Sequence, residues 1–116
     1  SPICHAPCMV RTAAYKAVGG YSVDKRLLRV EDYHLWFKMY AAGHKAYMLK
    51  DPIYSMRDDR NAVRRRKFRG YWNEFNLKCK GSDMIGLPKR VKIYALRPLL
   101  VWALPNFLYN YLHRKK

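Results

Sequence analysis

The chain has 116 residues, at most the size of one ordinary domain. Half of the residues are hydrophobic and 15% are aromatic, so the composition provides for a packed core and excludes an intrinsically disordered chain. The formal net charge of +16 predicts an anionic partner, which is a nucleic acid, an acidic lipid or a phosphorylated substrate. Because the sequence starts at Ser1 and enters directly into a patterned segment, we expect a fragment of a longer protein.

The N-terminal segment alternates between two kinds of side chain over residues 4–11, which predicts a short strand. Pro7 places this strand at a sheet edge or a bulge, because proline cannot donate to a central ladder. A short helix is predicted over residues 12–18, ended by Gly19-Gly20.

The three cysteines are odd in number and lack paired spacing, so we predict free thiols in a reducing compartment. A zinc site is the alternative, although its ligands would lack the spacing familiar from structural zinc sites. The ligands of that site would be Cys4, His5, Cys8 and Cys79.

The most informative stretch is a predicted helix that starts at Glu31 and ends before Gly43, a left-handed cap. Residues at i, i+3, i+4 and i+7 define one face of it: Asp32, Leu35, Trp36 and Met39. An acid thus leads an apolar stripe and points toward the core or a cleft floor. Either the two first-turn acids merely favour the helix dipole, or Asp32 is a general base aimed into a site.

Two further short strands are predicted at residues 46–49 and 53–56, with a turn at Asp51-Pro52 between them. The Arg-Asp-Asp-Arg sequence at 57–60 ends the second strand. Its adjacent acids are either metal ligands or part of a solvated turn.

A second strong helix is predicted over residues 61–80, with a crowded basic cluster at 64–69. Its apolar stripe consists of Phe68, Tyr71, Trp72, Phe75 and Cys79. Cations near a helix N-terminus oppose the dipole, so this cluster either faces an anionic partner or forms a solvated face.

Residues 81–86 are predicted to be a linker, and the remainder is an amphipathic tail. Its apolar run is too short and too broken to span a bilayer, which needs about 20 residues. Cations beside a tryptophan are typical of a helix that lies among lipid headgroups. The predicted membrane residues are Lys89, Arg90, Lys92, Arg97 and Trp102. Docking of this tail on a missing part of the protein is the alternative.

Several separated motifs together resemble one family. They are I-C-H-A-P-C-M-V-R, A-V-G-G-Y, V-E-D-Y-H-L-W-F-K-M-Y-A-A-G, P-I-Y-S-M-R and L-R-P-L-L-V-W-A-L-P. In this order they resemble the C-terminal half of family 2 glycosyltransferases, the inverting GT-A-fold enzymes of bacterial polysaccharide and capsule assembly. The resemblance implies an α/β fold, the C-terminal part of a GT-A fold, in which short strands alternate with amphipathic helices. Residues 1–80 would be the acceptor-side half, and residues 81–116 the linker and the membrane-associating tail.

The same resemblance implies roles for individual residues. Asp32 would be the base that takes the proton from the acceptor hydroxyl as it attacks a nucleotide-sugar. Glu31 would position the acceptor or brace the loop. The implied substrate contacts are His5, Arg57 and Trp36. Neighbouring acids on one helix do not flank a sugar, which argues against a two-carboxylate glycosidase.

The resemblance also implies Mn²⁺ or Mg²⁺ in the full-length enzyme, held by a D-x-D motif that this sequence lacks. The motif is expected in a missing N-terminal half, and these residues are expected to hold no metal. Where many relatives have a histidine, the chain reads Met56-Arg57-Asp58-Asp59. The Q-x-x-R-W element of processive synthases is absent, so transfer of a single sugar is predicted.

The expected partners are a nucleotide-sugar donor, a glycan or lipid-linked sugar acceptor and an anionic membrane surface, with no nucleic acid. The expected location is the cytoplasm, peripheral on the inner face of the cytoplasmic membrane, and the fragment alone is expected to be inactive. The alternative is a basic nucleic-acid-binding module in which Tyr71 and Trp72 form a stacking face. A third interpretation is a membrane-peripheral adaptor in which Asp32 is structural. The position of the cations and of Asp32 distinguishes these interpretations.

Overall fold

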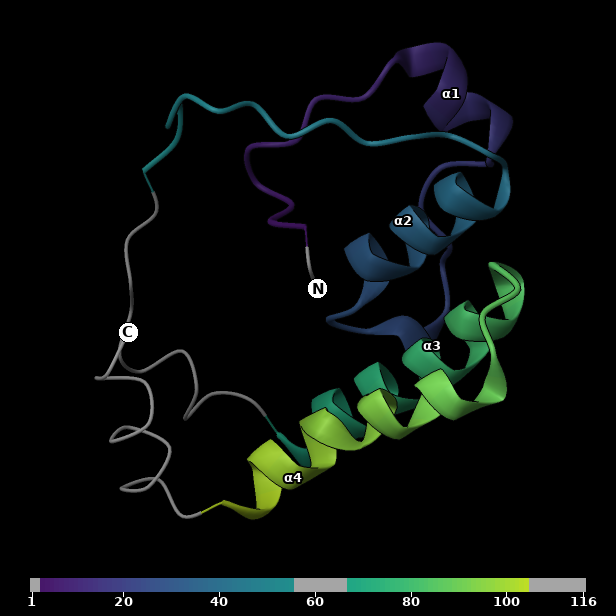
Figure 1. Ribbon diagram of the computed structural model, residues 1–116, viewed down its shortest axis with the longest axis vertical. Coiled ribbons are helices and arrows are strands. Elements are labelled where there is room, and N and C mark those ends of the chain that lie inside the picture. Colours follow the sequence, from purple (N-terminus) through teal and green to yellow (C-terminus); the bar gives the residue numbers. More distant parts are fainter. Residues whose placement is uncertain (1–2, 56–66, 105–116) are drawn as a thin grey trace.

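The computed structural model describes residues 3–55 and 67–104, and these form an assembly of helices (Figure 1). The elements, in chain order, are α1 (Thr12–Ala17), the 3-10 helix η1 (Lys25–Leu27), α2 (Glu31–Ala41), α3 (Phe68–Met84), the 3-10 helix η2 (Lys89–Leu96) and α4 (Arg97–Ala103). Within the described residues, no helix has the length and apolar character needed to cross a membrane.

The predicted α/β fold, with the short strands of a GT-A enzyme, is wrong, because residues 3–55 and 67–104 contain no strand. Residues 46–49 and 53–55 are exposed and form no regular element, because a strand needs a neighbouring strand to receive its hydrogen bonds. The predicted strand over 4–11 begins instead with a turn, in which the Cys8 N–H donates to the His5 carbonyl at 3.1 Å. Met56, the last residue of the third predicted strand, lies outside the described residues.

Helix α2 is the centre of the molecule because it is buried on two faces. The predicted stripe is confirmed on one face, where Leu35, Trp36 and Met39 pack against the N-terminal segment and α1. On the other face, Phe37 packs with Val30 and with Leu77 of α3. Two buried faces fix both the position and the rotation of α2 about its own axis.

Helix α2 ends before Gly43, as predicted, and Gly43 has a φ of +81°. The His44 N–H reaches back to the Met39 carbonyl at 3.0 Å, as in a left-handed cap. The loop before α2 is held by α3, because the buried Asn73 Nδ2 donates to the Leu28 carbonyl at 3.2 Å. Both ends of α2 are therefore fixed by hydrogen bonds.

Gly81 of α3 lies directly against the Phe37 ring of α2. A Cβ atom at this position would lie 2.4 Å from ring carbons of Phe37, so only glycine leaves room for the ring. The sequence predicted a linker from Gly81, whereas α3 continues through Met84 and the chain turns at Gly86, with a φ of +68°.

The segment after Gly86 folds back along α3 (Figure 1). Ala95 of η2 and Pro98 of α4 are buried by this packing. Lys92 of η2 forms an ion pair with Asp83 at 2.8 Å, and such an exposed pair adds little stability. The predicted boundary between residues 80 and 81 falls inside α3, and the division into two domains stays a prediction.

We predict that Gly81→Ala destabilises the protein by about 1–3 kcal/mol, because the added methyl group overpacks the contact with Phe37. Alanine is the better helix former by about 1 kcal/mol, so any loss measures the packing conflict and not helix propensity. Urea unfolding is the measurement. Lys80→Ala, at the adjacent exposed position of α3, is the control and should change stability little. Equal or higher stability of Gly81→Ala would contradict the contact.

Candidate functional site

The acidic pair lies at the start of α2, where the backbone is fixed on both sides. Arg29 has a left-handed φ of +71°, and the buried Val30 is the N-cap without a capping side chain. Glu31 is exposed and Asp32 is half-buried in the first turn. The helix dipole stabilises negative charge at this end, so the two carboxylates sit where the backbone favours them.

The Gly-Gly-Tyr motif brings Tyr21 to this end of α2. Gly19 and Gly20 have φ values of +72° and +58°, and a Cβ on Gly20 would lie 2.8 Å from the Tyr15 ring. The Tyr15 hydroxyl accepts from the Tyr21 N–H at 3.3 Å, and the Lys38 ammonium donates to the Gly20 carbonyl. The turn is therefore joined to both α1 and α2.

The side chains of Tyr21 and His5 meet beside the acids. The Tyr21 hydroxyl lies 2.8 Å from His5 Nε2, at hydrogen-bond distance. The centroid of the His5 ring lies 5.9 Å from that of Tyr21 and 5.7 Å from that of Trp36. Burial raises the pKa of Tyr21, and nearby groups that include Asp32 and Glu31 raise it further through their negative charge. The hydroxyl is thus protonated at neutral pH and can donate a hydrogen bond.

The structure therefore brings three predicted site residues, Asp32, His5 and Trp36, to one corner. Trp36 is only 8% exposed, and its Nε1 has no hydrogen-bond partner within the described parts of the chain. Arg57 lies outside the described residues. Tyr21 was missed by the residue-level prediction, although the Gly-Gly-Tyr motif that positions it was recognised.

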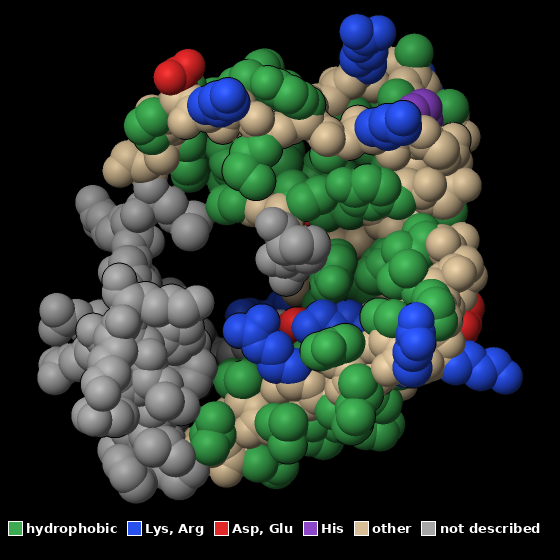
Figure 2. All heavy atoms as spheres, viewed as in Figure 1, with side chains coloured by type: hydrophobic (Ala, Val, Ile, Leu, Met, Phe, Trp, Pro, Cys, Tyr) green, Lys and Arg blue, Asp and Glu red, His purple; other side chains and the backbone are tan. Residues whose placement is uncertain are grey.

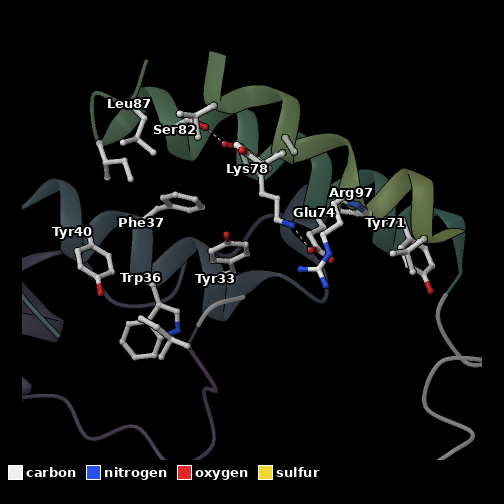
Figure 3. A pocket seen from close by; sticks show the side chains of 17 residues that line it. Tyr33, Trp36, Phe37, Tyr40, Tyr71, Glu74, Lys78, Ser82, Leu87 and Arg97 are labelled. Carbon is white, nitrogen blue, oxygen red and sulfur yellow. Dashed lines mark hydrogen bonds and ion pairs between the residues drawn. The ribbon is translucent and has the colours of Figure 1, made fainter. Parts of the chain in front are cut away.

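A cavity of about 730 Å³ opens between α2 and the α3–η2–α4 layer (Figure 3). One part of its wall is aromatic, where the rings of Tyr33 and Phe37 stack with centroids 4.9 Å apart. Its polar part contains the Glu74–Lys78 ion pair, at 2.9 Å, beside Arg97.

Trp36 also lines a second cavity, of about 430 Å³, on the side of the N-terminal segment. Asp32 lines neither of the two cavities. The prediction that Asp32 faces a cleft floor is therefore not supported by these two cavities. The carboxylate is linked to the neighbouring Tyr21 by its charge, which raises the pKa of that tyrosine.

The possible zinc site is not formed. Among residues 3–55 and 67–104, no three His, Cys, Asp or Glu side chains come together as metal ligands. Cys8 instead uses its thiol to donate to the Cys4 carbonyl at 2.9 Å. The adjacent acids Asp58 and Asp59 lie outside the described residues.

The predicted membrane residues differ in their surroundings. Lys89, Arg90 and Arg97 are exposed, whereas Lys92 is engaged by Asp83. Trp102 is 53% exposed. Of the stacking face proposed for nucleic acid, Tyr71 is only 6% exposed, so its ring is not open to a base.

Comparison with known proteins gives one informative match. No family model and no solved structure matches the chain. The chain is 31% identical over all 116 residues to a protein of Bacillus subtilis (strain 168) named "Putative glycosyltransferase EpsE". The predicted resemblance to a glycosyltransferase is confirmed. The match covers 42% of the length of that relative, so the chain corresponds to less than half of it.

We predict that protonation of His34 on α2 weakens folding in acid. His34 is half-buried, and its Nδ1 has no hydrogen-bond partner among residues 3–55 and 67–104. Burial, followed by the charge of Lys38, lowers the pKa of His34 below its ordinary value. The unfolded chain binds this proton more readily, so the free energy of unfolding falls as pH drops from about 6.5 through the folded-state pKa.

Urea unfolding at a series of pH values measures this effect. His34→Gln, which cannot be protonated, should flatten the slope of stability against pH below about 6.5. His44→Gln is the matched control, and an unchanged slope in His34→Gln would contradict the assignment.

Proposed function

We propose that the chain is the acceptor-side part of an inverting family 2 glycosyltransferase that uses a nucleotide-sugar donor. The observation that carries this proposal is the similarity of the whole chain to a protein named as a glycosyltransferase. The corner at the start of α2 supports it, because a half-buried carboxylate there lies beside a tyrosine–histidine hydrogen bond.

In the proposed reaction, Asp32 accepts the proton of an acceptor hydroxyl. The freed oxygen lone pair forms a bond to the anomeric carbon, and the bond from this carbon to the nucleoside diphosphate breaks on the opposite face. The bonding electrons leave with the diphosphate, and the configuration at the anomeric carbon is inverted. General-base catalysis of this kind is worth about 10²–10⁴-fold in rate.

The neighbours of Asp32 have positioning roles in this proposal. The protonated Tyr21 hydroxyl and the His5 ring hold the acceptor oxygen within reach of the base. Trp36 packs beneath the His5 ring and keeps it in place. Glu31, about 100° around the helix from Asp32, is exposed and contacts other hydroxyls of the acceptor.

Donor binding is proposed to depend on residues outside this chain. The diphosphate leaving group needs a cation such as Mn²⁺ or Mg²⁺ to neutralise it, and the described residues form no site for one. The sequence has no D-x-D motif. We place the metal and the nucleotide in a region that corresponds to the remaining length of the relative, with Arg57 as a further phosphate contact.

The proposed biological setting is the transfer of single sugars during synthesis of cell-surface polysaccharide. The enzyme would lie in the cytoplasm on the inner face of the membrane, where the cationic residues after Gly86 meet acidic lipids. The acceptor would be a glycan or a lipid-linked sugar. The burial of Tyr71 makes the nucleic-acid alternative the weaker one.

We predict that Asp32→Asn, in the full-length enzyme, lowers transfer by at least about 10²-fold while donor affinity stays nearly intact, because the amide cannot accept the proton. Transfer of a labelled sugar and calorimetric donor binding are the two measurements. Glu31→Gln is the matched control, with a smaller loss expressed in the KM of the acceptor. Full turnover by Asp32→Asn would remove this residue from the role of base.

We predict that Tyr21→Phe raises the acceptor KM by about two- to tenfold, the cost of one lost hydrogen bond, with donor binding unchanged. Tyr47→Phe, in the exposed stretch after α2, is the control for loss of a tyrosine hydroxyl. An unchanged acceptor KM in Tyr21→Phe would separate Tyr21 from acceptor binding.

A further inference from the structure

Three aromatic side chains form a continuous row on the outside of α3 and α4. The rings of Phe68 and Trp102 have centroids 4.7 Å apart, and those of Phe68 and Trp72 are 6.2 Å apart. Phe68 and Trp72 are each 46% exposed, and Trp102 is 53% exposed. We call these three residues the aromatic platform. So much exposed aromatic area in one place is typical of an interaction surface.

The platform is a product of the fold and combines residues from two helices. Because α4 runs back along α3, its last turn lies beside the first turn of α3 (Figure 1). The sequence placed Phe68 and Trp72 in one stripe with Tyr71, but the structure buries Tyr71 and leaves the other two rings outside. Of the three platform residues, Trp102 alone was among the residues that the sequence predicted to contact a membrane.

The surroundings of the platform are cationic. Residues 67–104 contain eight Lys or Arg and only two acids, Glu74 and Asp83. Both acids form ion pairs, with Lys78 and Lys92. Lys67 and Arg69 are exposed and flank Phe68 in the sequence. Figure 2 shows hydrophobic side chains gathered along the α3–α4 layer, with Lys and Arg side chains close by.

We propose that the aromatic platform is the surface through which the protein binds an anionic lipid bilayer. The indole and phenyl rings enter the headgroup region, where Trp is favoured, and Lys67 and Arg69 meet lipid phosphates. This inference rests on the proposed membrane location but not on the chemistry of sugar transfer.

The geometry favours a bilayer over a nucleic acid as the partner. Bases stack on open, separated ring faces. In the platform the rings lean on one another, with interplanar angles of 33° for Phe68–Trp72 and 57° for Phe68–Trp102. Rings packed against one another leave no space for a base to stack between them. Together they form a continuous apolar surface that lipid can contact.

Vesicle binding of the full-length protein that carries this chain tests the proposal. We expect sedimentation with vesicles of phosphatidylglycerol and phosphatidylcholine, and much weaker binding to phosphatidylcholine alone. Tryptophan emission should shift to the blue on binding, because Trp72 and Trp102 leave water. The Trp36→Phe variant should keep this shift, since Trp36 is already buried.

Variants of the platform provide the decisive comparison. Combined Trp72→Ala and Trp102→Ala should weaken vesicle binding about tenfold to a hundredfold, because the two rings no longer bury their exposed area. The matched control is combined Tyr47→Ala and Tyr54→Ala, two exposed aromatic residues elsewhere in the chain, which should bind as the wild type does. Trp102→Phe should retain most of the binding, and unfolding curves identify any variant that fails to fold.

The outcomes separate this inference from the proposed function. If the platform variants bind vesicles as tightly as the wild type, the platform is not the binding surface, although membrane association itself would stand. Failure of the wild type to bind vesicles would overturn both the platform and the proposed membrane association. Binding of a single-stranded oligonucleotide, lost in the platform variants without any vesicle binding, would establish the nucleic-acid alternative instead. Unchanged transfer to a water-soluble acceptor in these variants would show that the platform acts apart from catalysis.

Discussion

The arrangement of the molecule depends on the contact between the Phe37 ring and the backbone of Gly81. Without a side chain at position 81, α3 comes close enough for the ring to lie against the helix itself. Leu77 and Val30 extend this contact into the core that joins α2 to α3. Since the opposite face of α2 is also buried, the same contact sets the rotation of the helix whose first turn carries Asp32.

Local patterns in the sequence predicted the helices well, because a helix makes its hydrogen bonds within one segment. The spacing of Leu35, Trp36 and Met39 identified one buried face of α2, and the position of Gly43 identified its end. The face of α2 that packs on α3 also has a sequence pattern, an apolar stripe at i, i+3 and i+7 that consists of Val30, Tyr33 and Phe37. Two apolar stripes on one helix indicate burial on both sides, a signal that the single-stripe interpretation missed.

The strands could not be predicted in the same way, since pairing depends on residues far away in the chain. Residues 46–49 were predicted to be a strand but form no regular element, because the described chain offers them no strand to pair with. The site shows the same distinction. Asp32, His5 and Trp36 were each predicted as site residues. The hydrogen bond between Tyr21 and His5, in contrast, depends on a turn that brings together residues sixteen positions apart. The basic composition indicated an anionic partner, but only packing of α4 on α3 shows where the exposed rings gather.

The length of α3 between the aromatic platform and Gly81 has a geometric consequence. Gly81 lies thirteen positions after Phe68, which corresponds to about 20 Å along a helix axis. If the platform lies among lipid headgroups as proposed, α3 would be a rigid spacer, and the Phe37 contact would transmit its tilt to α2. The distance of the Asp32 carboxylate from the bilayer surface would then be fixed by the fold. A fixed distance of this kind would favour acceptors whose terminal hydroxyl lies at the same distance from the bilayer surface, whatever the shape of their sugar.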